Sequence, residues 1–186
     1  MKSNTVRALN PTKVQQLMKL YSKAEYTRLN HQIAKLLKKY QDDFFLNNMG
    51  GVVAAQLGLK DRASKYFNRA ISIKPKASEP HVNLGYLLLE DNEPRRALEA
   101  FKNAQNLSQE NIEAHLGSGA ALDKMGMFDG ALLAFTIAQK IQPRNHRVYY
   151  LAGNTYQKMN KLIEAKATFK HAIKLNPNFF DAHNNL

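Results

Sequence analysis

Apolar and small side chains recur along this chain with a period of 34 residues. Each period has an alanine, an aromatic residue four positions later, and a second alanine seven positions after the first. These positions hold Ala63, Phe67 and Ala70; Ala97, Phe101 and Ala104; Ala131, Phe135 and Ala138; and Ala165, Phe169 and Ala172. A glycine lies 12 residues before each first alanine, at Gly51, Gly85, Gly119 and Gly153. A fixed period of this length predicts a solenoid, in which each unit packs against its neighbours.

Two amphipathic helices are predicted within one period, residues 78–111. Leu84 and Leu88 mark the apolar face of the first helix, and Pro94 marks the first turn of the second, where proline is well tolerated. Gly85 lies inside the apolar face of the first helix, where glycine costs about 1 kcal/mol relative to alanine. We therefore expect the second helix to approach closely at Gly85, with the ring of Phe101 filling the space between the helices.

The turn between the two helices also recurs every 34 residues. Its residues are Ala24, Gly58, Asn92, Gly126 and Asn160. Four of these five are glycine or asparagine, which tolerate the left-handed conformation that closes a helix. Prolines at Pro75, Pro143 and Pro177 break the chain between periods. Each unit is therefore predicted to be an antiparallel helical hairpin.

The period divides the chain into an N-terminal tail and a series of units. We predict a tail at residues 1–9, a divergent capping repeat at 10–43, repeats at 44–77, 78–111, 112–145 and 146–179, and the start of a truncated further repeat at 180–186. The capping repeat carries Leu17, Leu29, Ile33 and Leu36 where the other units have glycine, alanine, an aromatic residue and alanine. Because the last unit stops early, we expect either a continuing chain or another surface that covers its apolar side.

These positions match a known repeat. The third unit supplies His81, Leu84, Gly85, Leu88, Ala97, Phe101, Ala104 and Gln109, and the fifth supplies Tyr149, Ala152, Gly153, Tyr156, Ala165, Phe169, Ala172 and Pro177. The pattern resembles the tetratricopeptide repeat, strongly over residues 44–180 and weakly over 10–43. The resemblance implies an all-α fold, a right-handed α-solenoid of antiparallel helical hairpins that forms the tetratricopeptide superhelix. It also implies a concave groove, lined by the first helix of each unit, that binds a protein or peptide segment.

The resemblance also implies which side chains face this groove. The predicted partner-binding residues are Tyr21, Phe45, Asn48, Asn83, Tyr86, Glu90, Lys124, Arg147, Tyr150, Asn154 and Lys158. They combine aromatic anchors, amides able to bond a peptide backbone, and charges of both signs. Some family members clamp a carboxylate with lysine, asparagine and arginine, but the matching residue types here lie in a different register, so no such clamp is expected.

Several apolar residues occupy the same predicted face. Leu116 is expected to line the groove. Met49, Val52, Leu89 and Leu151 are as compatible with packing against the next helix as with contact to a partner.

The charge is unevenly distributed along the chain. The net charge is +12, with 9 − 3 = +6 in residues 1–43, 6 − 1 = +5 in 44–77, 3 − 6 = −3 in 78–111, 3 − 3 = 0 in 112–145 and 6 − 2 = +4 in 146–186. Basic residues gather on second helices, as at Lys166, Lys170 and Lys174, spaced by four. These outer faces are predicted to be solvated, with contact to an acidic partner as the functional alternative.

No residue pattern indicates catalysis, a cofactor or a metal site. The chain has no cysteine, and its repeated histidines, His81, His115 and His183, are predicted to be packing residues. No apolar run approaches the roughly 20 residues that cross a bilayer, and no secretory signal is visible. We expect no enzyme activity from these residues and a cytoplasmic location, although an enzyme domain beyond Leu186 remains open.

Three functions compete at this point. The first is a protein- or peptide-binding scaffold, with end-to-end self-association open. The second is the substrate-recruiting N-terminal arm of a larger glycosyl- or sulfotransferase, because residues 81–85 and 182–186 resemble repeats that precede such domains. The third is a basic RNA-associated helical repeat protein, which the acidic groove residues Glu79, Glu90, Glu113 and Asp123 disfavour.

Overall fold

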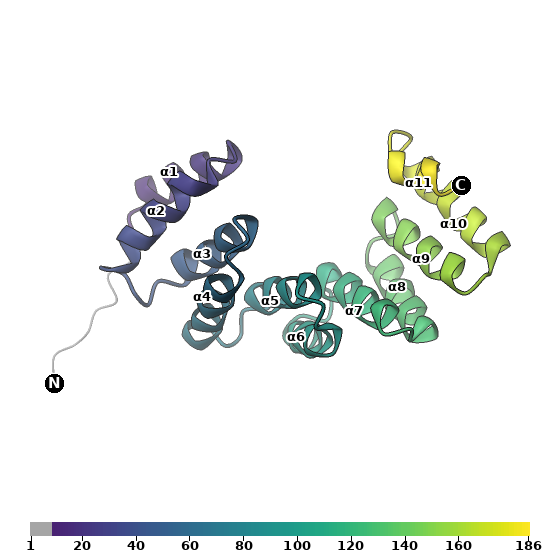
Figure 1. The fold of residues 1–186 in the computed structure, drawn as a ribbon, viewed down its shortest axis with the longest axis horizontal. Helices are drawn as coiled ribbons and strands as arrows, with labels where there is room; N and C mark the ends of the chain where they lie inside the picture. The colour runs from purple at the N-terminus through teal and green to yellow at the C-terminus, as the bar shows by residue number, and fades with distance from the viewer. Residues whose placement is uncertain (1–8) are drawn as a thin grey trace. The chain divides into compact units, whose positions relative to one another are not determined.

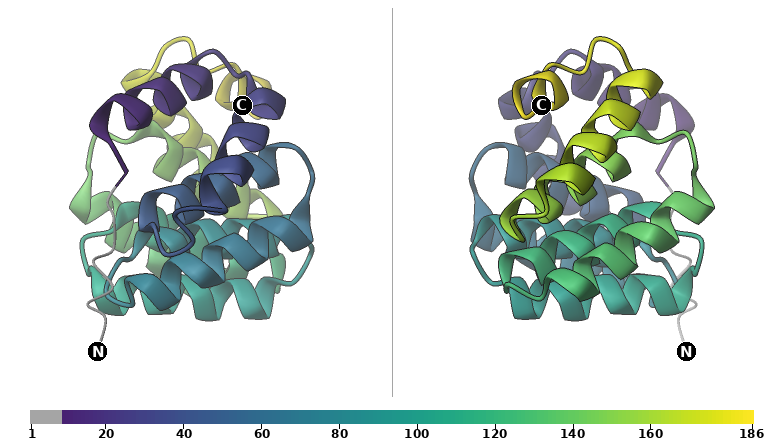
Figure 2. Two further views of the ribbon diagram at one scale, coloured as in Figure 1. Left: turned by 90° about the vertical axis from the view of Figure 1, so that its left-hand side faces the viewer. Right: turned by 90° about the vertical axis from the view of Figure 1, so that its right-hand side faces the viewer.

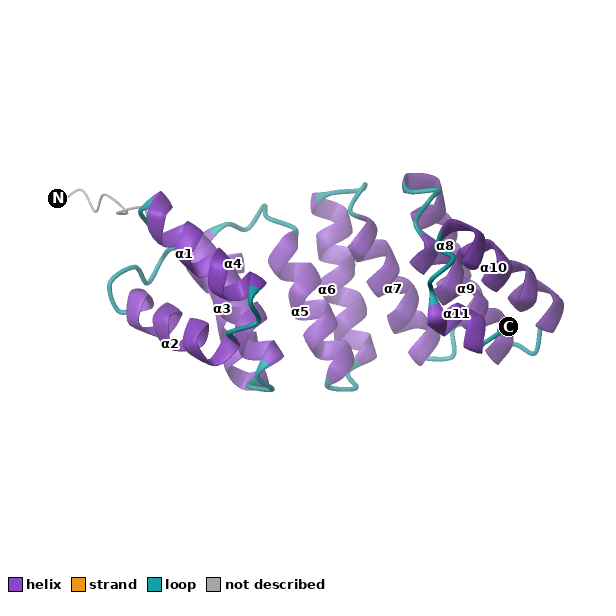
Figure 3. Cartoon of the chain, turned by 90° about the horizontal axis from the view of Figure 1, so that it is seen from above, coloured by secondary structure: helices purple, strands orange, loops and turns teal. Residues whose placement is uncertain are grey.

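The computed structural model describes residues 9–186, and within them every regular element is an α-helix (Figure 3). The helices are α1 (Pro11–Ser22), α2 (Tyr26–Leu37), α3 (Phe44–Gln56), α4 (Lys60–Ile73), α5 (Glu79–Glu90), α6 (Pro94–Leu107), α7 (Ile112–Lys124), α8 (Phe128–Ile141), α9 (His146–Lys158), α10 (Leu162–Leu175) and α11 (Phe180–Asn184). Of the predicted tail, only Leu9 lies within the described residues.

The chain forms two compact units, Met1–Leu87 and Leu88–Leu186, whose boundary lies within α5. In unit 1, α1 packs on α2, α2 on α3 and α3 on α4. In unit 2, α6 packs on α7, α7 on α8, α8 on α9, α9 on α10 and α10 on α11. The pairs within each unit are visible as neighbouring helices in Figures 1 and 2. The division of the chain into a tail, a cap and successive repeats stays a prediction.

First helices begin with side-chain caps and second helices follow tight turns. Asn10, Asp43, Asn111 and Asn145 each accept a hydrogen bond from a backbone N–H two or three residues later, as N-cap residues do. At the turns, the φ angles are 55° at Ala24, 71° at Gly58, 57° at Asn92, 74° at Gly126 and 59° at Asn160. The predicted left-handed turn is therefore confirmed in all five hairpins, including the one that carries alanine.

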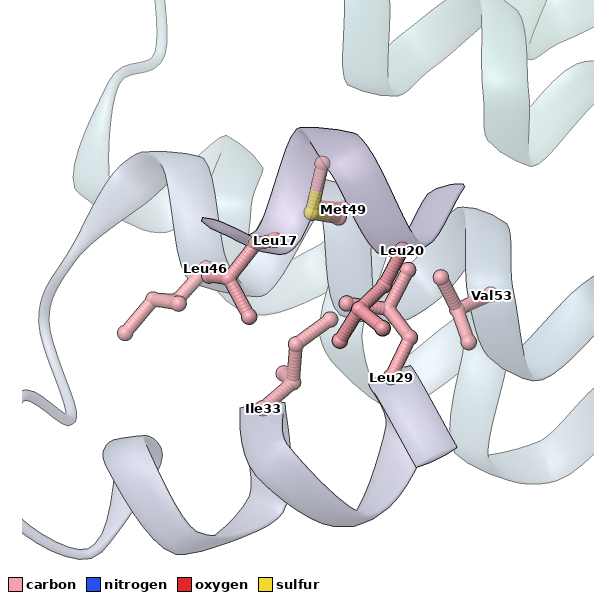
Figure 4. Close-up of a cluster of buried hydrophobic side chains, with 7 residues drawn as sticks. All are labelled: Leu17, Leu20, Leu29, Ile33, Leu46, Met49 and Val53. Carbon is pink, nitrogen blue, oxygen red and sulfur yellow. The ribbon is translucent and has the colours of Figure 1, made fainter. Parts of the chain in front are cut away.

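The core of the first hairpin is built from bulky aliphatic side chains (Figure 4). Its buried members come from three consecutive helices: Leu17 and Leu20 of α1, Leu29 and Ile33 of α2, and Leu46, Met49 and Val53 of α3. Because α3 contributes to this cluster, the first hairpin buries its apolar face against the next helix, as a stacked repeat does.

Three of the other hairpins bury an aromatic ring against a glycine. A Cβ atom added at Gly51 would lie 2.4 Å from the Phe67 ring, at Gly119 2.3 Å from Phe135, and at Gly153 2.5 Å from Phe169. These distances are too short for any side chain, so the glycine is required by the ring. The predicted close approach at this position is confirmed for these three glycines, and its cause is the aromatic side chain of the second helix.

A second repeating contact fixes the loop between hairpins. Asn47, His115, Tyr149 and His183 lie at one repeat position, and each donates a side-chain hydrogen bond to the backbone carbonyl oxygen six residues earlier. The distances are 2.9, 2.8, 2.9 and 2.9 Å. His115 and His183 therefore do more than pack: they hold the preceding loop against the start of their helix.

Candidate functional site

In unit 1, two of the predicted groove residues form an amide pair. Asn83 of α5 donates from Nδ2 to Oδ1 of Asn48 of α3, at 3.1 Å. Phe45 is half-buried and packs against the core of the first hairpin. Tyr86 is also half-buried. The structure thus links α3 and α5 through side chains that the sequence assigned to partner binding.

Tyr21 lies apart from that amide pair. Its ring meets the ring of Tyr26 edge-on, with 5.7 Å between centroids, and it packs against the first hairpin's core. This contact gives Tyr21 a structural role within the first hairpin, whether or not it also touches a partner.

In unit 2, the charged residues of the predicted groove pair with the preceding repeat. Lys158 of α9 forms an ion pair with Asp123 of α7, and Thr155 donates to the same carboxylate at 2.8 Å. Because the Asp123 side chain is only 13% exposed, this charge is stabilised by both donors. Arg147 pairs with Glu113 at 3.0 Å across the same two helices.

Of the two remaining charged groove residues, Lys124 contacts the backbone of α5 and Glu90 is exposed. The Lys124 ammonium donates to the backbone carbonyl oxygen of Leu89 at 2.9 Å, so it adds a hydrogen bond to the last turn of α5. Glu90 is exposed at the end of that helix.

The C-terminal part of unit 2 contains a second amide pair. Asn185 donates from Nδ2 to Oδ1 of Asn154 at 2.9 Å. The ring of Tyr150 lies 5.0 Å from that of Phe179 and 6.0 Å from that of Phe169. Tyr150 and Asn154 of α9 therefore contact the two ends of α11, at Phe179 and Asn185.

Four of these polar contacts share nearly the same spacing in sequence, which sequence reasoning missed. The pairs Asn48–Asn83, Asp123–Lys158 and Leu89–Lys124 are each 35 residues apart, and Glu113–Arg147 is 34 residues apart. The available signal was complementarity between residues one period, or one period plus one, apart. Much of the predicted groove chemistry therefore joins consecutive first helices to each other.

The apolar residues expected on this face mostly belong to the core. Leu116 is 1% exposed and lies in a core cluster with Phe135 and Val148, so its assignment to the groove was wrong. Met49 and Leu89 are buried as well. Val52 and Leu151 are partly buried and pack against core clusters of their own units.

The basic outer faces are exposed. Lys166, Lys170 and Lys174 of α10 are all exposed, as are Lys35, Lys38 and Lys39 at the end of α2. On α4, Arg69 forms an ion pair with Asp42.

The residue types that ligate metals do not gather at one place in residues 9–186. No group of three or more histidine, aspartate or glutamate side chains there is placed to hold a metal ion. Burial lowers the pKa of His81 from its ordinary value of 6.5, because the charged imidazolium loses hydration. Among the same residues, no helix is both long and apolar enough to cross a membrane.

Comparison with known proteins agrees with this architecture. Models of the tetratricopeptide repeat match residues 46–76, 82–146 and 146–179. A comparison with curated protein sequences found no match.

Three solved structures illustrate the likeness of fold. YrrB, described as a tetratricopeptide repeat protein with an unusual peptide-binding site, is 24% identical with a TM-score of 0.71, over 90% of this chain and 87% of YrrB. MamA is 23% identical with a TM-score of 0.75, over 86% of this chain and 93% of MamA. TTC0263, a thermophilic repeat protein of Thermus thermophilus, is 18% identical with a TM-score of 0.77, over 91% and 93%. With its hairpins, turns and glycine–phenylalanine contacts, this all-α chain belongs to the tetratricopeptide repeat family.

Proposed function

We propose that this chain is a protein-interaction scaffold that binds an extended peptide segment along its first helices. The observation that carries the proposal is the pair of half-buried amides in each unit, Asn48–Asn83 and Asn154–Asn185. Each bond uses one N–H of one asparagine and the oxygen of the other. The remaining donors and acceptors have the chemistry that a peptide backbone requires.

Two further points support this proposal. Family membership favours protein or peptide binding, and YrrB is described as having a peptide-binding site. The half-buried aromatic side chains of Tyr86 and Tyr150 lie on the same helices as Asn83 and Asn154. Aromatic residues are frequent anchors at binding surfaces because they bury a large area with few rotatable bonds.

The test uses peptides selected for binding to the whole chain from a displayed library of unrelated sequences. Fluorescence polarisation then measures their Kd for wild type and for Asn83→Ala, Asn154→Ala and Tyr86→Ala. Loss of one backbone hydrogen bond should weaken binding by about tenfold. Lys102→Ala, an exposed change on α6, is the matched control. Peptides whose affinity survives all three groove substitutions would refute groove binding.

No contact among the described residues favours either of the two other functions considered from the sequence. The transferase arm and the RNA-associated protein therefore rank below the scaffold. A cytoplasmic location stays a prediction. End-to-end self-association also stays a prediction, with the exposed Phe180 side chain as the residue to test.

A further inference from the structure

Unit 2 contains a cavity of about 720 Å³ between two consecutive helix turns. One wall comes from the α5–α6 turn and the start of α6: Asn92, Glu93, Pro94, Arg95 and Arg96. The other wall comes from the α7–α8 turn: Lys124, Met125 and Met127. We call these eight residues the turn pocket. Of the predicted groove residues, it shares only Lys124.

The apolar part of the turn pocket consists of Pro94, Met125 and Met127. Met127 caps α8, and its side chain is 55% exposed. Met125 and Pro94 are half-buried beside it. In the other hairpins the position of Met127 holds Glu25, Leu59, Glu93 and Lys161. An exposed, flexible thioether adapts to differently shaped apolar side chains, so this wall suits a hydrophobic partner residue.

The polar part of the turn pocket is basic within an acidic repeat. Arg96 is neutralised by Glu93, at 2.6 Å. Lys124 donates to a neutral carbonyl oxygen, so its charge is not compensated there. Arg95 is exposed and has no ion pair among the described residues. The eight lining residues therefore carry 3 − 1 = +2. Those that lie within residues 78–111 carry 2 − 1 = +1, in a repeat that carries 3 − 6 = −3 as a whole.

We propose that the turn pocket binds a short acidic protein segment that carries an apolar side chain between its carboxylates. The apolar side chain lies against Met125 and Met127, and the carboxylates pair with Arg95 and Lys124. A volume of this size matches pockets that hold a few side chains. No aromatic ring lines the pocket, so it lacks the stacking platform that single-stranded nucleic acid uses. This site shares only Lys124 with the predicted groove and does not depend on the function proposed there.

Methyl NMR of the whole chain tests the proposal, with methionine labelled at its methyl carbon. The chain has six methionines, whose signals are assigned by single Met→Leu variants. The probe is the acetylated, amidated peptide of sequence EDLDE, and the comparison peptide is KKLKK. We expect saturable shifts of the Met125 and Met127 signals with EDLDE, no comparable shift with KKLKK, and unchanged Met18 and Met49 signals.

Charge variants separate the turn pocket from a general basic surface. Arg95→Glu should weaken EDLDE binding at least about tenfold, since it replaces an attractive contact by a repulsive one. Arg144→Glu makes the same charge change at an exposed loop position of unit 2 and should leave the affinity unchanged. Asn154→Ala, which tests the groove, should also leave it unchanged.

Several results would overturn the proposal. These are no methionine shift at millimolar EDLDE, equal shifts with KKLKK, or an Arg95→Glu variant that binds as wild type does. Displacement of EDLDE by an unstructured oligonucleotide of thymidines at lower concentration would instead assign the pocket to nucleic acid.

Discussion

The first two hairpins of unit 1 keep one register but fill it in opposite ways. In the α1–α2 hairpin, the first helix provides Leu17 where the α3–α4 hairpin has Gly51. The second helix provides Ile33 where the other hairpin has Phe67. All three of these large side chains are buried to within 1% of full burial. The α1–α2 hairpin fills this pair of positions with one side chain from each helix. The α3–α4 hairpin fills it with the ring of Phe67 alone.

This difference shows that what the two hairpins share is the volume that the two facing positions fill together. The residue at each single position differs. Gly51 is demanded by Phe67, because any Cβ there would overlap the ring. Leu17 is tolerated because Ile33 is smaller and leaves room on the α1 side. Interiors are packed to near-crystalline density, so a change at one member of the pair has to be matched at the other.

The largest expected effect comes from emptying the ring site. Phe67→Ala should lower the free energy of unfolding by about 3–5 kcal/mol, because it removes a buried ring and leaves a cavity. Ile33→Ala should cost about 2–5 kcal/mol, and less than Phe67→Ala, because fewer atoms are lost. Urea unfolding followed by circular dichroism measures both. An equal or larger loss for Ile33→Ala would mean that the Phe67 ring does not contribute more to stability than the Ile33 side chain.

A double-mutant cycle then tests whether Gly51 and Phe67 act as a pair. Gly51→Ala should cost about 1–3 kcal/mol in the wild-type chain, because the new methyl group overlaps the ring. In the Phe67→Ala background it should be neutral or stabilise by about 1 kcal/mol, because alanine favours helix over glycine. Additive effects in this cycle would refute the pairing.

Gly119→Leu, next to Phe135, tests the same close contact in unit 2, with an expected cost of about 1–3 kcal/mol.

The turns of the two hairpins allow a smaller and opposite pair of changes. Ala24 has a φ of 55°, and Gly58 has a φ of 71° with no atom within 4 Å of an added Cβ. Ala24→Gly should therefore stabilise unit 1 by about 1 kcal/mol, and Gly58→Ala should destabilise it by about 1–2 kcal/mol. Thermal unfolding of the two variants measures both signs. Effects of the same sign would show that the turns differ by more than backbone conformation.

The smallest effect concerns pH. Because burial lowers the pKa of His81 in the folded chain, the unfolded chain takes up a proton more readily below its value of 6.5. Stability should fall as the pH drops below 6.5 and level off below the folded-state pKa. His81→Asn places there the residue that Asn47 provides in the second hairpin, and it should flatten this part of the profile. If His81→Asn loses as much stability as wild type between pH 7.5 and pH 5, the pH dependence does not arise from His81.

The sequence predicted the features that depend on residue size or backbone conformation. The hairpins, the left-handed turns at Ala24 and Gly58, and the demand for glycine at Gly51 all follow from a 34-residue spacing. It did not predict the polar contacts, because these join residue types that differ between repeats. Asp123 and Lys158, for example, lie at neighbouring repeat positions in different units, so a column-by-column comparison cannot relate them.

The hydrogen bonds between consecutive first helices have a consequence for how the chain folds. They join residues 31 to 35 apart in a chain of 186 residues. Each of these contacts therefore closes a loop of about one repeat, so the loop entropy lost is similar at each step along the chain. Folding is then expected to nucleate in a neighbouring pair of hairpins and to spread outward from there.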